Sequence, residues 1–242
     1  RNPELGTVPL ALLLVSVASL HLGISQMSAA SEFVSGRLLA ALDIHLLGWA
    51  GGLVGVPLYA TLQRQTDLFN RARIIAVNNI ANAVFMICSA LLGMVVLGMF
   101  QQSLSAFFIL ISALNLLVAL WFIGKLMRPM LRLLAQMAAA LHYRIQVEGL
   151  DNIPAKGPAL LVCNHVSFVD ALILGGNIRR PVRFVMYYKI FRIPVLNFIF
   201  RTARAIPIAG AKEDPALMEK AFAEVGDALR KGDVVGIFPE GA

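Results

Sequence analysis

The sequence predicts a multi-domain chain in which membrane-spanning α-helices are followed by an α/β domain. Hydrophobic residues make up 58% of the chain and charged residues only 14%, whereas a soluble globular domain carries about 25% charged residues. The long apolar stretches end near residue 124. After residue 142, short runs rich in β-forming residues alternate with helical patterns, which is typical of α/β structure.

Four apolar stretches approach the roughly 20 residues that an α-helix needs to cross a bilayer core. They are Val8–Ser25, Ile44–Leu62, Ile74–Met99 and Leu104–Gly124. Basic residues lie between the second and third stretches and after the fourth, but residues 100–103 carry no charge. The positive-inside rule therefore predicts that both basic regions are cytoplasmic.

The second stretch contains a glycine pattern that favours close helix packing. Gly48, Gly51, Gly52 and Gly55 form two overlapping G-x-x-x-G pairs, a spacing that lets another helix approach closely. Pro57 is predicted to bend this helix. Residues 51–63, the following basic loop and the run Asn78-Asn79-Ile80-Ala81-Asn82 resemble the tenth and eleventh helices of a major facilitator transporter. More narrowly, they are similar to bacterial lysophospholipid transporters, which implies that residues 1–127 are the last four of twelve helices.

Three ionisable residues, His21, Asp43 and His45, lie within or at the edge of the apolar stretches. Such groups are candidates for function in a membrane protein. Asp43 and His45 are predicted to lie at the outer end of a helix, where headgroups and water solvate them. A role in transport is the alternative for all three.

Residues 128–142 are predicted to form an amphipathic linker helix. Lys125, Arg128, Arg132 and Gln136 lie on one side, and leucine, methionine and alanine cover the rest. The helix either lies in the membrane interface or extends the fourth span into the cytoplasm. Both alternatives keep the following domain, residues 143–242, close to lipid.

The α/β domain is predicted to contain five strands and three helices. The strands are Tyr143–Val147, Ala159–Cys163, Arg183–Tyr187, Ala205–Ile208 and Val234–Phe238. The helices are Phe168–Gly175, Val195–Arg201 and Pro215–Lys231, the last ending before Gly232 as a C-terminal cap requires. The chain starts at Arg1 and stops soon after the last strand, so we expect a C-terminally truncated piece of a longer protein.

A histidine and an aspartate follow the strand at residues 159–163, in the block Asn164-His165-Val166-Ser167-Phe168-Val169-Asp170. Histidine is a suitable general base near neutral pH, because its unperturbed pKa is about 6.5. Asp170 lies about one helical turn further on, where it can accept the other ring N–H and stabilise the imidazolium. The pair predicts direct attack by an acceptor hydroxyl, without a covalent acyl-enzyme.

The same residues permit a purely local interpretation. The run from Ser167 to Asp170 has the S-x-x-D pattern of a capping box, in which Asp170 returns a hydrogen bond to the helix start. The two interpretations are compatible. Cys163 lies in an apolar run and is predicted to be a packing residue and not a nucleophile.

A second block, Phe238-Pro239-Glu240-Gly241, ends the last predicted strand. Together the two blocks resemble the glycerolipid acyltransferase family. The resemblance implies that His165 and Asp170 are catalytic and that Glu240 binds the glycerol part of the acceptor. It implies an acyl thioester donor, acyl-CoA or acyl carrier protein, with no bound cofactor and no metal. Substrate-binding residues are then predicted to be Asn164, Ser167, Lys189, Arg204, Glu240 and Gly241.

Between Asp170 and Glu213 the sequence has no acidic residue but eight basic ones, interleaved with apolar and aromatic residues. We expect this stretch to contact anionic headgroups and to admit an acyl chain. Basic and aromatic residues can also bind nucleic acid, but the four predicted membrane spans argue against that function. The family's phosphate-binding block ends in an arginine, which is absent after Ile208. Arg204 or Lys212 could take the place of this arginine. Its absence favours an acceptor whose phosphate already carries a headgroup.

The two resemblances together imply a bacterial inner-membrane protein in which a lysophospholipid transporter is fused to a cytoplasmic acyltransferase. Membrane lipids, a lysophospholipid acceptor and the acyl donor are the predicted partners. Two alternatives are a 1-acylglycerol-3-phosphate acyltransferase of phospholipid synthesis and a transporter with a non-catalytic lipid-binding domain.

Overall fold

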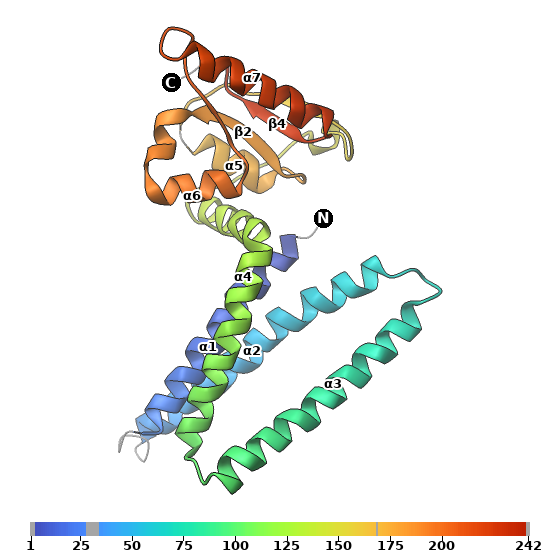
Figure 1. The fold of residues 1–242 in the computed structure, drawn as a ribbon, viewed down its shortest axis with the longest axis vertical. Helices are drawn as coiled ribbons and strands as arrows, with labels where there is room; N and C mark the ends of the chain where they lie inside the picture. Colours follow the sequence, from blue (N-terminus) through green and yellow to red (C-terminus); the bar gives the residue numbers. More distant parts are fainter. Residues whose placement is uncertain (1–2, 28–33, 168, 241–242) are drawn as a thin grey trace. The chain divides into compact units, whose positions relative to one another are not determined.

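The computed structural model describes residues 3–27, 34–167 and 169–240. The chain divides into two compact units, Asn2–Leu126 and Met127–Ala242, which are labelled by element in Figure 1. The linker helix predicted at residues 128–142 belongs to the second unit. Each unit is described separately below.

Among the described residues, four helices are long and apolar enough to cross a membrane. They are α1 (Thr7–Ser25), α2 (Val34–Gln65), α3 (Arg71–Gly93, continued by the π-helix η3, Met94–Met99) and α4 (Leu104–His142), with a short η1 (Pro3–Gly6) before them. The backbone of α4 leaves the helical region at Leu126 (φ −111°, ψ 20°). Pro129 explains this kink, because proline lacks an N–H and its ring clashes with the carbonyl four residues earlier.

Helices α1 and α4 contact each other closely through small and polar residues. A Cβ at Gly23 would lie 2.9 Å from Ile109 Cγ1 and 3.0 Å from the Ser105 carbonyl oxygen. The Ser112 hydroxyl donates to the Ser16 carbonyl (2.7 Å), and Asn115 Nδ2 donates to the Leu12 carbonyl (2.7 Å). Small residues and polar bonds of this kind stabilise helix pairs in lipid.

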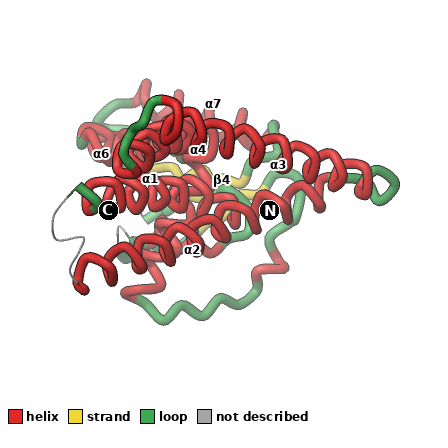
Figure 2. The backbone as a smooth tube through the Cα atoms, turned by 90° about the horizontal axis from the view of Figure 1, so that it is seen from below, coloured by secondary structure: helices red, strands yellow, loops and turns green. Residues whose placement is uncertain are grey.

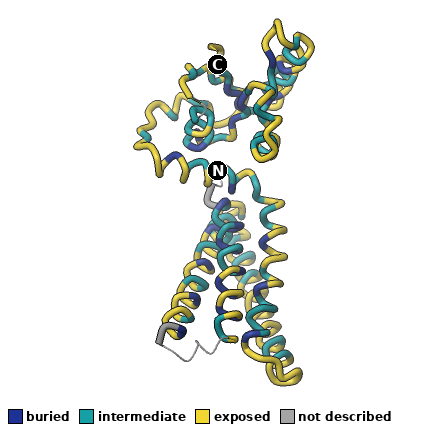
Figure 3. The backbone as a smooth tube through the Cα atoms, turned by 90° about the vertical axis from the view of Figure 1, so that its left-hand side faces the viewer, coloured by how far each residue is buried: buried dark blue, intermediate teal, exposed yellow. Residues whose placement is uncertain are grey.

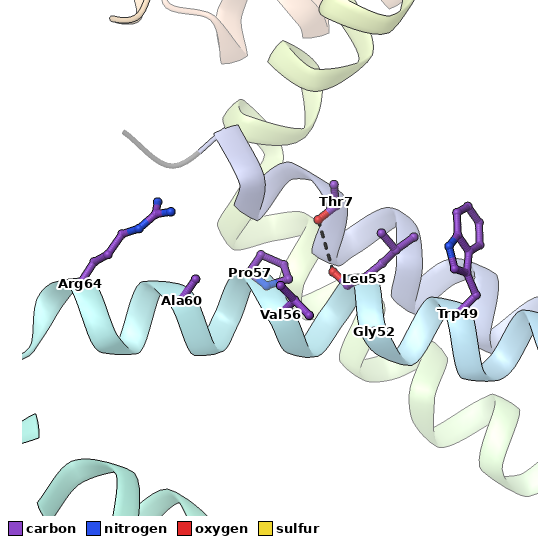
Figure 4. Close-up of a pocket in the computed structure, with 8 residues that line it drawn as sticks. All are labelled: Thr7, Trp49, Gly52, Leu53, Val56, Pro57, Ala60 and Arg64. Atoms are coloured by element: carbon purple, nitrogen blue, oxygen red, sulfur yellow. Dashed lines mark hydrogen bonds between the residues drawn. The ribbon is translucent and has the colours of Figure 1, made fainter. Parts of the chain in front are cut away.

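The predicted packing role of the glycines in α2 is not met within the described residues. A Cβ at Gly48, Gly51, Gly52 or Gly55 would have no described neighbour within 4 Å. Gly52 instead lines a groove of about 530 Å³ with Trp49, Pro57, Arg64 and neighbouring residues (Figure 4). Helix α3 has no buried residue, and exposed positions dominate much of the helical unit in Figure 3.

The prediction that Asp43 is solvated at a helix end is wrong. Helix α2 begins at Val34, about ten residues before the apolar stretch, so Asp43 lies inside it. The residue is 5% exposed, and its Oδ2 lies 2.7 Å from Nδ1 of His21 on α1. His45 is exposed, as predicted, and its Nδ1 bonds the Ala41 carbonyl at 2.7 Å.

The second unit is built on a four-stranded parallel sheet, whose strands are yellow in Figure 2. The strands β1 (Ala159–Val162), β2 (Val182–Tyr187), β3 (Ile206–Ile208) and β4 (Val234–Ile237) lie in the order β1-β4-β2-β3. Four predicted strands are therefore confirmed within about one residue. The fifth, Tyr143–Val147, is wrong: this mostly exposed segment pairs with no described strand, and alternation of residue types cannot make a strand without a partner.

Three helices accompany the sheet: α5 (Asp170–Asn177), α6 (Pro194–Thr202) and α7 (Pro215–Arg230). Short 3₁₀ turns, η4 (Leu150–Asn152) and η5 (Tyr188–Arg192), complete the unit. Helix α7 starts with Asp214 as its cap, whose side chain accepts from the Leu217 N–H at 2.9 Å. It ends two residues before Gly232, whose φ is 80°, so the predicted glycine stop is confirmed.

Helices α5 and α7 cover opposite faces of the sheet. Neighbouring residues of β2 point to opposite faces: Phe184 contacts Gly175 of α5, whereas Arg183 forms an ion pair with Glu224 of α7 (2.5 Å). Phe184 also lies against Gly236 of β4, where a Cβ would be 2.7 Å from its ring. The core on the α5 side therefore depends on a glycine in the central strand.

The end of α4, residues 127–142, packs its polar side chains against this domain. Arg132 donates to the carbonyls of Ile178 and Arg179, and Gln136 Nε2 donates to the Gly176 carbonyl (2.6 Å). These carbonyls lie at the C-terminal end of α5, where backbone acceptors lack helical partners. The polar face of the predicted linker helix therefore caps the end of α5, and the two alternatives for this helix stay predictions.

Candidate active site

The two sequence blocks meet at one edge of the sheet. Strands β1 and β4 are parallel neighbours, with Val162 opposite Ile237, so the segments that follow them leave at the same edge. The Cys163 N–H continues the pairing to the Ile237 carbonyl (3.1 Å). The His165 N–H then donates to Glu240 Oε2 (3.4 Å). Ligands of parallel sheets bind at such carboxyl ends.

His165 and Asp170 form the predicted pair. His165 Nδ1 lies 3.0 Å from Asp170 Oδ2, and their side chains are 17% and 25% exposed. The backbone N–H groups of Ser167 and Val166 also donate to this oxygen (2.9 and 2.8 Å). These two hydrogen bonds, with a further contribution from His165, hold the pKa of Asp170 below its usual value. A carboxylate accepts only, so Nδ1 donates its proton and Nε2 keeps the basic lone pair.

A capping box combines a bond from the serine side chain into the helix with a bond from the acidic side chain back to the serine N–H. The second of these bonds is confirmed. Asp170 does return a bond to the Ser167 N–H. The Asp170 N–H, however, donates to the Ser167 carbonyl (3.0 Å), while the Ser167 hydroxyl accepts from Val169 N–H at 3.4 Å. Helix α5 begins at Asp170, and the predicted start, Phe168, lies outside the described residues. Asp170 orients the imidazole and shapes the turn with the same oxygen.

Phe238 supports the imidazole, a role that the sequence interpretation missed. Its ring centroid lies 4.5 Å from that of His165, and it stacks on Phe184 at 5.9 Å with an interplanar angle of 8°. His165 is thereby connected to the apolar core through two aromatic rings. The available signal was position, because Phe238 directly follows the strand that pairs with β1.

The remaining residues of the two blocks line the same edge. Asn164, Ser167 and Glu240 are exposed, which leaves their polar groups accessible to a substrate. Gly241 lies outside the described residues. Burial, with a contribution from Asp170, raises the pKa of the Cys163 thiol; a protonated thiol is a poor nucleophile.

Lys189 lies at the same edge, in η5 after β2, but its charge is compensated. Its Nζ lies 2.6 Å from Glu213 Oε1, and the hydroxyls of Tyr187 and Tyr188 also donate to Glu213 (3.0 and 3.1 Å). Glu213 raises the pKa of Lys189, and Lys189 lowers the pKa of Glu213. This cluster could not be predicted from sequence spacing, because the pairing of β2 with β3 brings Glu213 to Lys189.

Arg204 is not brought next to His165. It precedes β3, the edge strand, and β4 and β2 lie between that strand and β1. Its backbone has a positive φ of 59°, and its carbonyl accepts from Arg183 Nε (2.9 Å). The side chain is exposed. A role for Arg204 at the reacting atoms therefore has no support from this geometry.

Residues 144–242 match the protein family described as Acyltransferase. A chloroplastic 1-acyl-sn-glycerol-3-phosphate acyltransferase, LPAT1, of Arabidopsis thaliana is 32% identical over 100 residues, which are 41% of this chain and 27% of the relative. A 1-acyl-sn-glycerol-3-phosphate acyltransferase of Borreliella burgdorferi is 31% identical over 105 residues, 40% of this chain and 38% of the relative. A lyso-ornithine lipid O-acyltransferase of Pseudomonas aeruginosa is 32% identical over 108 residues, 45% of this chain and 39% of the relative.

The chain thus spans less than half the length of these curated relatives. The matches support the acyltransferase domain that the two sequence blocks predict. They give no support to the transporter resemblance of residues 1–127, because the family match starts at residue 144. No solved structure is significantly similar to the chain.

Proposed function

We propose that residues 143–242 transfer a fatty acyl group from a thioester to the free hydroxyl of a lysoglycerolipid, with His165 as general base. The observation that carries this proposal is the bond between His165 Nδ1 and Asp170 (3.0 Å), at the sheet edge where Glu240 meets the His165 backbone. The named relatives that act on lysolipids also support it.

The chemistry follows from the tautomer of His165. An acceptor hydroxyl donates to Nε2, and its oxygen attacks the thioester carbonyl as the proton passes to the ring. The carboxylate of Asp170 stabilises the imidazolium that forms. Collapse of the tetrahedral intermediate breaks the carbon–sulfur bond, and the imidazolium returns its proton to the leaving thiolate. Base catalysis of this kind contributes roughly 10²–10⁴ in rate.

Two acceptor classes remain in the proposal. The missing arginine after Ile208 favours a lysophospholipid that carries a headgroup, whereas relatives named 1-acyl-sn-glycerol-3-phosphate acyltransferase favour lysophosphatidate. Glu240 is proposed to bind the glycerol part of either acceptor. Acyl-CoA and acyl carrier protein are both candidate donors.

The test uses membranes that contain the full chain, a labelled acyl donor of each type and a panel of lysolipids. We expect a labelled diacyl product, and loss of at least about 100-fold in rate for His165→Ala. His142 is exposed and its Nδ1 bonds the Ala138 carbonyl of its own helix, so His142→Ala is the matched control. Absence of product from every acceptor would support the non-catalytic lipid-binding alternative.

We also propose that residues 1–127 are the end of a major facilitator bundle in a bacterial inner membrane, with the acyltransferase domain cytoplasmic. The support is the sequence resemblance, the four apolar helices and the basic loops. Single cysteines at residues 68 and 101, labelled from outside intact cells by an impermeant maleimide, test this topology. Labelling is expected at 101 and not at 68, and the reverse pattern would contradict it.

A further inference from the structure

Helix α6 is bracketed by three arginines that lack a carboxylate partner among the described residues. Arg192 precedes it and stacks on Tyr188 at 5.5 Å. Arg201 lies in its last turn and bonds Asn197 Oδ1 (2.7 Å), and Arg204 follows it. By contrast, Arg179 and Arg183 are paired with acidic side chains. Uncompensated cationic charge is therefore gathered at the ends of α6.

The same helix presents large apolar side chains to solvent. Val195 is 69% exposed and Phe198 is 55% exposed, and their three-residue spacing places them on one face. Ile193, just before the helix, is 50% exposed. On the inner side, Phe200 packs against Phe191 with ring centroids 5.3 Å apart. Helix α6 thus has an exposed apolar face between cationic ends.

The end of α6 contacts the first turn of residues 127–142, in the same unit. The Thr202 carbonyl at the end of α6 accepts from Arg128 Nε (3.1 Å). Arg128 is only two residues beyond Leu126, the kink that closes the apolar part of α4. The other end of α6 follows η5, which starts at the carboxyl edge of the sheet beside β2. Within the second unit, α6 therefore runs from the carboxyl edge of the sheet to the first turn of residues 127–142.

We propose that α6 is an interfacial helix, which inserts Val195 and Phe198 into the headgroup–acyl boundary of an anionic phospholipid bilayer. Arg192, Arg201 and Arg204 then contact anionic headgroups, since apolar burial and cationic charge act together in such helices. If residues 143–242 have the proposed acyltransferase function, this position also lets a lysolipid reach the site without leaving the membrane.

The test measures depth and does not depend on activity. The full chain, with Cys88→Ser and Cys163→Ser, is reconstituted in nanodiscs of phosphatidylcholine with or without phosphatidylglycerol. A spin label is placed by Phe198→Cys or, as matched control, by Phe222→Cys on α7, where the phenylalanine is 62% exposed. We expect oxygen to relax the label more than aqueous nickel chelate does at residue 198, and the reverse at residue 222.

Anionic lipid should raise the oxygen-to-nickel ratio at residue 198 about two-fold or more, and Arg201→Gln should remove that increase. Equal aqueous accessibility at 198 and 222 would overturn the proposal. Shielding of residue 198 from both reagents would also overturn it, because that result means a protein partner or a second copy covers α6. A chain without any acyltransferase activity would leave this measurement unchanged, so failure of the proposed function is distinguishable.

A second arm links insertion to catalysis. With the proposed activity, Val195→Ser with Phe198→Ser should raise KM for a long-chain lysolipid in vesicles about ten-fold, with little change for a short-chain, water-soluble lysolipid. Phe222→Ser is the control. An equal loss with both acceptors would mean damage to the domain and would contradict a membrane role.

Discussion

Replacement of Asp170 by asparagine separates two functions of this carboxylate. The Oδ2 atom accepts from His165 Nδ1 and from the N–H groups of Val166 and Ser167. In Asp170→Asn, these two backbone donors favour the amide oxygen at the same place, because the amide NH₂ cannot accept. The His165 tautomer is then retained, and the variant loses mainly the negative charge.

The magnitude follows from the geometry of the pair. Opposite charges about 4 Å apart attract by about 4 kcal/mol at an effective dielectric constant near 20. The 17% and 25% exposure of the two side chains reduces this through solvent screening to roughly 2–4 kcal/mol of stabilisation for the imidazolium. The expected loss in kcat/KM is therefore about 30- to 1,000-fold.

The assay compares kcat/KM of wild type, Asp170→Asn and Asp170→Ala with the best acceptor from the panel. Alanine also removes the acceptor for three donors, so we expect a larger loss than with asparagine, accompanied by a lower melting temperature. Activity of Asp170→Asn within three-fold of wild type would refute the charge argument. Equal losses for both variants, with unchanged melting temperatures, would refute the claim that the two backbone N–H groups hold the oxygen in place.

Three further predictions concern stability. Gly236→Ala should destabilise the domain by about 1–3 kcal/mol in chemical unfolding, because the new Cβ would lie 2.7 Å from the Phe184 ring. The control is Gly210→Ala, whose Cβ would have no neighbour within 4 Å. It should change stability by less than about 0.5 kcal/mol. Arg132→Ala should cost about 1–3 kcal/mol, because it leaves two carbonyl groups at the end of α5 without a donor, and an unchanged melting temperature would contradict this. Since the folded pKa of Asp170 is lowered, its stabilisation should be complete above the unfolded value of about 3.9 and lost as the pH falls through the folded pKa; wild type should therefore lose more stability than Asp170→Asn in acid unfolding series below pH 4.

The sequence was sufficient for most of the second unit because its elements are short and clearly bounded. Apolar runs at residues 159–163 and 234–238 become β1 and β4, and each ends where a polar block begins. What could not be predicted is which strands are neighbours. The order β1-β4-β2-β3 brings Glu240 to His165 and Glu213 to Lys189, and both contacts join residues distant in sequence.

Other errors have local causes. The apolar stretch starts at Ile44 but α2 starts at Val34, so hydropathy alone puts Asp43 at a helix end although it is buried against His21. Residues 143–147 alternate like a strand but lack a described partner. In both cases a neighbouring element decides the structure: His21 of α1 buries Asp43, and residues 143–147 lack a described partner strand.

The spacing between His165 and Asp170 is explained by the double use of one oxygen. The chain turns between β1 and α5, and Asp170 must reach back to the ring of His165 while it accepts the N–H groups of Val166 and Ser167. An aspartate one position earlier would lie before the helix start, and one position later would point about 100° away around α5. Four intervening residues satisfy both demands. A local turn therefore fixes the orientation of the proposed base before any substrate binds, and the stacked rings of Phe238 and Phe184 hold that orientation against the core.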